Sequence, residues 1–310
     1  MIRRNRQFTA FLTVAAMLPL AGCFTGIEST PKITADDVKK QKIVVTPEQM
    51  FISDIGEGPL SEWSKGKRFL VTDDRISLIF GASARGVTSL CGEELIYQGY
   101  DSIPAITGDG ATLLEFSTSK GDKLKYKVDA PVRSVLSRRS VEIPFTIDLD
   151  VVATVRERLA TKRVYVITSM WFDRDGRQVT GRKFIPVTIT DVSPGNVNYP
   201  FYVSFVDDGG KSGGVYMSLG ASRQSTRNFD TLFSFTDPRL RYPNVSDDNW
   251  QNIINGVVAL DMTREECRLA LGFPKEIDRR PGYGGVEERW IYTDGVYLLF
   301  EDGLLRDFRR

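Results

Sequence analysis

The sequence predicts an α+β protein in which a strand-rich central region precedes a compact C-terminal module of two helices and three strands. Between about residues 66 and 220, apolar and β-branched runs alternate with glycine-containing turns, which is typical of short strands. Beyond residue 245, two capped helical segments are followed by two Asp-Gly turns. A hydrophobic fraction of 41% and a charged fraction of 26% are those of a chain that folds around a core.

The two halves of the central region resemble each other. Residues 67–72 (KRFLVT) resemble residues 162–168 (KRVYVIT), and residues 100–128 resemble residues 192–218, at a spacing of about 90 residues. Such a duplication indicates two small, related β-barrels or sandwiches, although strand composition alone could produce the match. We expect a short helix over residues 152–159, between the halves.

The C-terminal module begins with two helices whose ends are encoded in the sequence. Ser246 can cap a helix that ends before Gly256. Thr263 can cap a second helix, and Glu266 stands three residues later, as a capping box requires. Gly272 suits the position after the last turn.

Three strands are expected after these helices, over residues 287–292, 296–300 and 304–308. Asp294-Gly295 and Asp302-Gly303 connect them, and Asp-Gly between alternating apolar runs is a strong hairpin signal. The glycine-rich residues 279–286 are predicted to form a mobile loop.

The N-terminus resembles the signal peptide of a bacterial lipoprotein. A basic start, Met1–Arg6, precedes an apolar run too short to span a bilayer, and the lipobox-like Leu20-Ala-Gly-Cys23 follows. The resemblance implies cleavage before Cys23 and acylation there, and several acyl chains make a stable anchor. Phe24 stands where an inner-membrane retention signal would have aspartate, which implies the outer membrane and its periplasmic side. The alternative is an ordinary signal peptide with a chance cysteine.

A chain of 310 residues suits two or three domains. The expected organisation is a signal peptide over 1–22, a tether over 23–45, a first β-rich module over 46–150, a second over 151–245 and the C-terminal module over 246–310.

Composition excludes several classes of function. The chain has no histidine, which removes Ser-His-Asp and Cys-His catalysis and imidazole metal sites. With 41 basic and 40 acidic residues, the net charge of +1 gives no field that would attract nucleic acid. We therefore expect no catalytic residues, no cofactor, no metal and no nucleic-acid partner.

Two cysteines, Cys91 and Cys267, remain besides Cys23. In an oxidising compartment they could form a disulfide, or each could be a buried thiol. Reactivity is the third alternative for Cys267, which lies between arginines and glutamates. Because Cys267 falls inside a capped helix, we interpret it as a framework residue.

The C-terminal module resembles the SmpA/OmlA-type outer-membrane lipoproteins, also called BamE-like. The residues that carry the resemblance are Met262-Thr263, Glu266, residues 271–274 (LGFP), Trp290-Ile-Tyr292, Phe300 and Gly303-Leu304. The resemblance covers about a fifth of the chain and implies a non-catalytic envelope module that packs against partner proteins or lipid headgroups. Asp261 stands where that family usually has glycine.

The central region is similar in strand density and duplication to SH3-like modules of bacterial envelope proteins, which implies peptide or cell-wall binding. Aromatic residues beside arginines are typical of recognition surfaces. We expect such a surface at Tyr199, Phe201, Arg239, Arg241 and Tyr242. Since side chains alternate along strands, core packing is the other interpretation of these clusters.

Two motifs that suggest other chemistry have simpler interpretations. Residues 209–212 (GGKS) end like a phosphate-binding loop, but they lie between strands and lack the first glycine, so we predict a hairpin turn. Carboxylate pairs such as Asp73-Asp74 face opposite sides of a strand and do not make an acid/base pair by themselves.

The expected function is that of a non-catalytic, palmitate-bearing outer-membrane lipoprotein, a scaffold or accessory subunit that binds envelope proteins. The first alternative is a peptidoglycan or glycan binder that uses SH3-like modules. The second is a histidine-free hydrolase that uses carboxylates or a Ser-Lys pair, which would need converging carboxyl groups or a lysine beside a serine hydroxyl.

Overall fold

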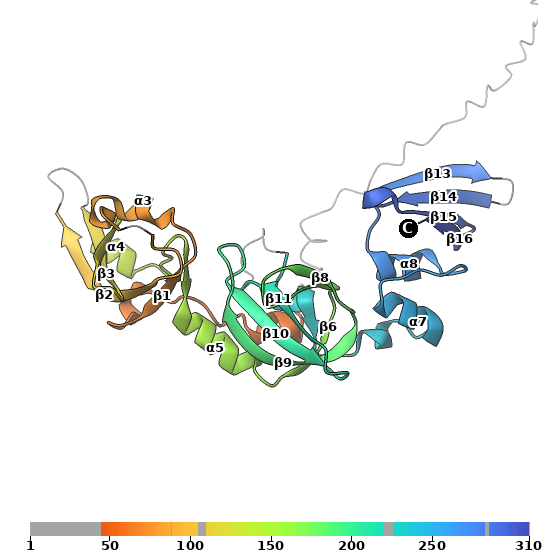
Figure 1. Cartoon of the computed structure of the whole chain (residues 1–310), viewed down its shortest axis with the longest axis horizontal. Coiled ribbons are helices and arrows are strands. Elements are labelled where there is room, and N and C mark those ends of the chain that lie inside the picture. The colour runs from red at the N-terminus through yellow and green to blue at the C-terminus, as the bar shows by residue number, and fades with distance from the viewer. Residues whose placement is uncertain (1–44, 88, 105–109, 220–225, 283–284, 310) are drawn as a thin grey trace, which may run out of the picture. The chain divides into compact units, whose positions relative to one another are not determined.

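The computed structural model describes residues 45–87, 89–104, 110–219, 226–282 and 285–309, and these form an α+β protein with three antiparallel sheets (Figure 1). The strand-rich α+β fold class is thereby confirmed. The predicted signal peptide, Cys23 and nearly all of the tether lie outside the described residues. Within the described part of the chain, none of the helices is both long and apolar enough to cross a bilayer.

The first sheet has five strands in the order β4-β3-β2-β1-β5. They are β1 (Arg68–Val71), β2 (Glu94–Ile103), β3 (Ala111–Thr118), β4 (Lys123–Val128) and β5 (Thr146–Asp148). The helical segments around them are η1 (Leu60–Glu62), α3 (Ile76–Phe80), η2 (Gly81–Ala84) and α4 (Val132–Leu136). We call this part, residues 59–148, the first repeat, and it has a hydrophobic core of its own.

The second sheet has seven strands in the order β12-β6-β9-β10-β11-β7-β8. They are β6 (Arg163–Val166), β7 (Met170–Phe172), β8 (Gln178–Thr180), β9 (Ile185–Pro194), β10 (Phe201–Asp207), β11 (Ser212–Met217) and β12 (Phe233–Ser234). A short helix, α6 (Phe229–Leu232), leads directly into β12. We call this part, residues 160–234, the second repeat.

Five neighbouring strands of the second sheet repeat the first sheet. The order β12-β6-β9-β10-β11 corresponds to β5-β1-β2-β3-β4. The register also corresponds, because Phe69 pairs with Leu95 in the first repeat as Val164 pairs with Val187 in the second. The duplication that the sequence suggests is therefore present in the strand pairing.

The irregularities of the two sheets recur at corresponding places. The ladder between β2 and β3 skips Gln98, and the ladder between β9 and β10 skips Thr190. A bulge of this kind inserts one unpaired residue and bends its strand. Because a shared bulge is harder to produce by composition than a shared strand pattern, it is strong support for a common architecture.

The hairpin turns correspond as well. The N–H of Gly121 donates to the Thr118 carbonyl at 3.0 Å, and the N–H of Gly210 donates to the Asp207 carbonyl at 2.9 Å. Both glycines have positive φ, 90° and 81°, which favours glycine in these turns. Residues 209–211 thus belong to a hairpin turn between β10 and β11, as predicted, and Ser212 begins β11.

The two repeats differ in the connection between their first two strands. The first repeat has α3 and η2 there, whereas the second has the hairpin β7–β8, which pairs with β11 through Phe172 and Gly214. Trp171 of this hairpin is completely buried, and a Cβ on Gly213 would lie only 2.6 Å from its ring. At the corresponding position of the first repeat stands the buried Leu124. The tryptophan of the hairpin therefore occupies the space that a leucine side chain fills in the first repeat.

Helix α5 (Leu149–Leu159) connects the repeats and contains the helix predicted over residues 152–159. The Asp148 carboxylate caps it by accepting from the N–H groups of Asp150 and Val151. Its buried side is apolar and includes Val155 and Leu159. The helix thus belongs to the core of the second repeat.

Helix α2 (Pro47–Phe51) precedes the first repeat in the sequence but packs on the second. The Gln49 amide donates to the Asp230 carboxylate at 2.9 Å, and the rings of Phe51 and Phe229 lie 5.4 Å apart. Thr46 and Gln49 form a capping box at its start. Helix α2 therefore packs on the second repeat, although the first repeat lies between the two in the sequence.

The C-terminal module has the two predicted helices, α7 (Asp247–Ile254) and α8 (Arg264–Leu271), and four strands. The strands are β13 (Glu276–Gly282), β14 (Gly285–Ile291), β15 (Tyr297–Glu301) and β16 (Leu304–Arg309). The short segments η3 (Pro238–Arg241) and η4 (Thr293–Gly295) lie before α7 and between β14 and β15. The loop predicted over 279–286 is wrong, since most of these residues form the hairpin β13–β14, which adds a fourth strand (Figure 1).

Both helix caps are formed as the sequence predicts. The Ser246 hydroxyl accepts from the Asn249 N–H, and Thr263 and Glu266 form a capping box. Asp261, just before α8, has φ of 66°, in the left-handed region that glycine tolerates best. Aspartate tolerates this region better than most residues other than glycine.

The C-terminal module and the second repeat share one hydrophobic core. The rings of Phe184 and Trp250 stack with centroids 5.6 Å apart. The buried Lys183 ammonium donates to the Ala270 carbonyl near the end of α8 at 2.6 Å, where the helix dipole favours a cation. Burial lowers the pKa of Lys183 to about 8.

Candidate functional site

A pocket of about 540 Å³ lies in the second repeat, a size that suits ligand recognition. We call it the aromatic pocket. Its walls come from hairpin β7–β8, the β9–β10 turn, β11 and α6. Its lining residues are Thr168, Met170, Phe172, Gly176, Asn196, Tyr199, Tyr216, Thr226, Arg227, Thr231 and Leu232.

Arg227 is the only charged residue among the described residues that line this pocket. Its guanidinium lies 5.5 Å from the Phe172 ring centroid and 5.9 Å from that of Tyr199. Its Nε donates to the Tyr216 carbonyl at 2.9 Å, and one Nη lies 3.2 Å from the Met170 sulfur. Burial lowers the pKa of Arg227. The guanidinium is thus held in place by carbonyl, sulfur and ring contacts, and none of the described carboxylates pairs with it.

Tyr199 is positioned by the β9–β10 turn. The Asn196 side-chain oxygen accepts from the N–H groups of Asn198 and Tyr199, both at 3.0 Å. A Cβ on Gly195 would lie 2.2 Å from the Tyr199 carbonyl, so this turn needs glycine at its first position. The ring of Tyr199 is half-buried and forms one wall of the pocket.

The first repeat has another arrangement at the corresponding place. Phe145 stands directly before β5 as Leu232 of the aromatic pocket stands directly before the corresponding strand β12, and Arg75 contacts Phe145. The Arg75 guanidinium lies over the Phe145 ring at 4.9 Å and donates to Asp73 at 2.8 and 2.6 Å. The arginine of the first repeat is therefore paired with a carboxylate, in contrast to Arg227.

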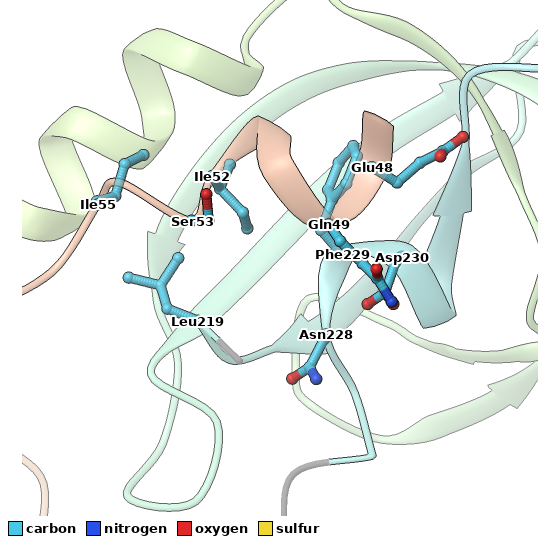
Figure 2. Close-up of a pocket in the computed structure, with 9 residues that line it drawn as sticks. All are labelled: Glu48, Gln49, Ile52, Ser53, Ile55, Leu219, Asn228, Phe229 and Asp230. Carbon is cyan, nitrogen blue, oxygen red and sulfur yellow. The ribbon is translucent and has the colours of Figure 1, made fainter. Parts of the chain in front are cut away.

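A second, smaller pocket of about 270 Å³ lies between α2 and α6 (Figure 2). Figure 2 shows Ile52, Ile55 and Leu219 toward one end and Gln49 and Asp230 toward the other. The hydrogen bond from Gln49 to Asp230 closes the polar end. We interpret this pocket as the seam by which α2 attaches to the second repeat.

Glu48 of α2 strengthens that attachment. Its carboxylate accepts from the Phe235 N–H at 2.9 Å and from the Ser234 hydroxyl at 3.3 Å. Burial raises the pKa of Glu48, but the hydrogen bonds outweigh it, and the pKa lies below its ordinary value. The side chain is therefore a structural anion between α2 and the end of β12.

The structure separates the residues expected to form one recognition surface. Tyr199 lies in the aromatic pocket, whereas Phe201 is only 2% exposed and belongs to the core, so its place in an exposed surface was predicted wrongly. Arg239 lies over the Trp250 ring at 5.3 Å and pairs with Asp247. Arg241 and Tyr242 line a separate small pocket of about 170 Å³ beside η3. The prediction thus combined residues of two separate pockets with a core residue and an ion-paired arginine.

The other residues considered from the sequence are Asp74 and the two cysteines, Cys91 and Cys267. Asp74 accepts from the N–H groups of Leu90 and Cys91, at 2.8 and 2.9 Å, and these bonds lower its pKa. Cys91 and Cys267 are free thiols, so the disulfide alternative is not formed in this structure. Cys91 is exposed, whereas Cys267 is completely buried, and burial raises its pKa to about 12. A thiol with such a pKa is a poor nucleophile, which agrees with a framework role.

A buried ionic cluster lies where the first repeat meets α5. The Lys67 ammonium lies 2.7 Å from Asp148 and 3.2 Å from Asp150. Burial, together with the nearby carboxylates of Glu142 and Asp148, raises the pKa of Glu57 to about 7. Since Asp148 also caps α5, the cluster joins the helix to the first repeat.

No protein-family model, curated protein or solved structure matches this chain. The aromatic pocket is therefore characterised by its own geometry. Its residues are separated in the sequence, and Arg227 stands in no aromatic run, so the sequence alone gave no signal for it. Tyr199 was found because it lies in an aromatic cluster over residues 196–205, and aromatic residues are typical of recognition surfaces.

Proposed function

We propose that this protein is a non-catalytic lipoprotein of the outer membrane that faces the periplasm and binds an envelope protein. The lipobox-like Leu20-Ala-Gly-Cys23 supports the anchor. The capped helices and the left-handed Asp261 support a BamE-like C-terminal module. The strand order of the two repeats supports two related SH3-like modules.

The aromatic pocket is the observation that carries the binding proposal. It combines aromatic walls with one arginine, and tyrosine and arginine are the residues that contribute most strongly to protein recognition. The turn around Asn196 and the bonds of Arg227 hold the walls in place before any ligand arrives. Preorganised walls lower the entropic cost of binding.

Removal of the Tyr199 ring, which forms one wall of the aromatic pocket, tests this proposal. Tagged wild-type protein and a Tyr199→Ala variant would be crosslinked in intact cells, and the recovered envelope proteins compared by quantitative mass spectrometry. We expect a partner that the wild type recovers and that falls at least about five-fold with Tyr199→Ala, since loss of a central aromatic costs more than 1 kcal/mol.

The control is Tyr100→Ala, which removes a 45% exposed tyrosine from the first repeat. This variant should recover the partner at the wild-type level. Equal recovery by all three proteins, or no recovered partner above the untagged background, would contradict the proposal.

The anchor has an independent test. Wild-type cells labelled with radioactive palmitate should yield a labelled protein that fractionates with the outer membrane. Cys23→Ser should remove both the label and the membrane association, while Cys91→Ser should change neither. Label that persists in Cys23→Ser would contradict anchoring at this residue.

A second candidate function is binding of peptidoglycan, because aromatic rings such as those of Phe172 and Tyr199 can also stack on sugars. It predicts that purified protein pellets with purified peptidoglycan and that Tyr199→Ala stays in the supernatant. Equal pelleting of the wild type and Tyr199→Ala would argue against this function for the pocket.

A further inference from the structure

The aromatic pocket contains a cation whose electrostatic partner is not a carboxylate. Within the described residues, no aspartate or glutamate forms an ion pair with Arg227, and its Nε donates to the Tyr216 carbonyl instead. Two of the other arginines that lie over rings are paired, since Arg75 bonds to Asp73 and Arg239 bonds to Asp247. Arg227 differs from these two arginines in having no such pair among the described residues, and it lines a pocket.

The environment of Arg227 makes an unpaired charge costly. Removing a guanidinium from water without an anionic partner opposes its ionisation, in agreement with the lowered pKa. None of the described residues that line the pocket is acidic. An anionic group that entered the pocket would restore the missing charge interaction in a partly desolvated place, where such interactions are strongest.

The shape of the site indicates which anion fits. The two rings and the Tyr216 carbonyl fix the plane of the guanidinium, and planar forks match planar carboxylates. A single arginine is a weak site for phosphate, and the chain has a net charge of only +1, so no field would draw a polyanion. The walls formed by Met170, Phe172 and Leu232 suit an apolar group next to the carboxylate.

We propose that the aromatic pocket binds a carboxylate that a partner peptide carries next to an apolar side chain, and that Arg227 pairs with this carboxylate. This inference rests on the proposed function and specifies its ligand. The carboxylate can come from an acidic side chain or from a chain terminus, since the chemistry of recognition is the same.

The test compares ligands that differ only in charge. The probes are N-acetyl-phenylalanine with its amide, and acetyl-Phe-Glu-amide with acetyl-Phe-Gln-amide, titrated into full-length protein with labelled methionine methyl groups. The chain has only 6 methionines, and the Met170 sulfur contacts Arg227, so its methyl signal reports on the site. Inorganic phosphate is a further probe.

We expect both acids to shift the Met170 signal and to bind at least about ten-fold more tightly than their amides, with phosphate weaker than either acid. Stronger binding of one acid assigns the source of the carboxylate. Arg227→Gln should remove the difference between acid and amide. Arg174→Gln, an exposed arginine on the same hairpin, should preserve it.

Equal affinity of acids and amides for the wild type would overturn the inference, and this comparison needs no variant. Phosphate binding that exceeds that of both acids would overturn it as well. If Arg227→Gln does not fold, Tyr199→Leu provides the second variant, and it should weaken the acids while Arg227 stays present. Failure of the acids to bind, combined with partner loss in Tyr199→Ala, would leave the proposed function standing and remove only the ligand class.

Discussion

The two repeats have the same strand order, register and bulge, and yet only the second carries the aromatic pocket. In the first repeat, the connection between the first two strands is helical, and Asp74 holds it by bonds to Leu90 and Cys91. In the second, a hairpin crosses to β11 and brings Trp171 into the core and Phe172 to the pocket. Binding residues often lie on connections that a rigid sheet holds in position, so a change in one connection can create a site while the sheet stays the same.

The repeats also differ in how they join the rest of the chain. Lys67 of the first repeat pairs with Asp148, whereas the corresponding Lys162 lies over the Phe51 ring at 5.9 Å. The first repeat is thus attached to α5 by buried charges, and the second is attached to α2 mainly by aromatic packing.

The largest effect is expected at Trp171, the residue that marks the difference between the sheets. Trp171→Ala should lower the free energy of unfolding by about 3–5 kcal/mol, because the ring is completely buried against Phe205. Gly213→Leu, which copies Leu124 of the first repeat, should clash with Trp171 in the wild type. In the Trp171→Ala background it should instead restore about 1–2 kcal/mol by filling the space.

Chemical denaturation followed by circular dichroism measures all four proteins. A double variant that is less stable than Trp171→Ala alone would break the proposed correspondence between Gly213 and Leu124.

The next effect concerns Glu57, which precedes the first repeat and lies near the carboxylates of Glu142 and Asp148. Glu57 has its pKa raised from 4.5 to about 7, so the folded state keeps a proton over a range in which the unfolded chain has lost it. This contribution to stability is present below pH 4.5 and is lost as the pH rises through 7. Glu57→Gln should therefore be more stable than the wild type at pH 8 by on the order of 1–3 kcal/mol, and the gain should disappear near pH 4.

Denaturation curves at pH 4, 6 and 8 provide the measurement, and Glu62→Gln, an exposed neighbour, is the control. A gain that does not change with pH would contradict burial of Glu57 as its cause.

The smallest effect tests the positions that precede the first strands. Gly66 and Thr161 both have positive φ, 96° and 66°. The N–H of Gly66 donates to the Tyr97 carbonyl in β2, and the N–H of Thr161 donates to the Ile189 carbonyl in the corresponding strand β9. A β-branched residue is strained there by about 1–2 kcal/mol, and glycine loses part of that gain through its chain entropy. Thr161→Gly should therefore stabilise by up to about 1 kcal/mol.

The reciprocal Gly66→Thr should destabilise by about 1–2 kcal/mol. Thermal unfolding of both variants at neutral pH is the measurement. Destabilisation by Thr161→Gly would show that the two positions are not equivalent.

The local parts of the fold were predictable because their signals are local. The caps at Ser246 and Thr263, the turn at 209–212 and the apolar alternation of β10 each depend on neighbours in the sequence. The strand β13 was missed because Pro281 and the glycines around it indicate a loop, whereas the hairpin places them at its turn end. The duplication was visible because its spacing is nearly constant.

The candidate site was less predictable because it is assembled by tertiary structure. Arg227 becomes a candidate only because its guanidinium lies near the rings of Phe172 and Tyr199. These rings come from strand β7 and from the β9–β10 turn. Phe201 and Tyr199 look alike in the sequence, and only the pairing of β10 decides that one is core and the other is wall. The net charge of +1 gives no indication of the site either, because the sum is the same whether or not an arginine is ion-paired.

The proposed function requires that the second repeat meets its partner through the aromatic pocket. A photo-reactive phenylalanine analogue placed at Tyr199 or at Tyr100 in living cells measures this contact directly. We expect a discrete crosslinked adduct from position 199 and none from position 100. Adducts from position 100 alone, or the same adducts from both positions, would contradict the claim.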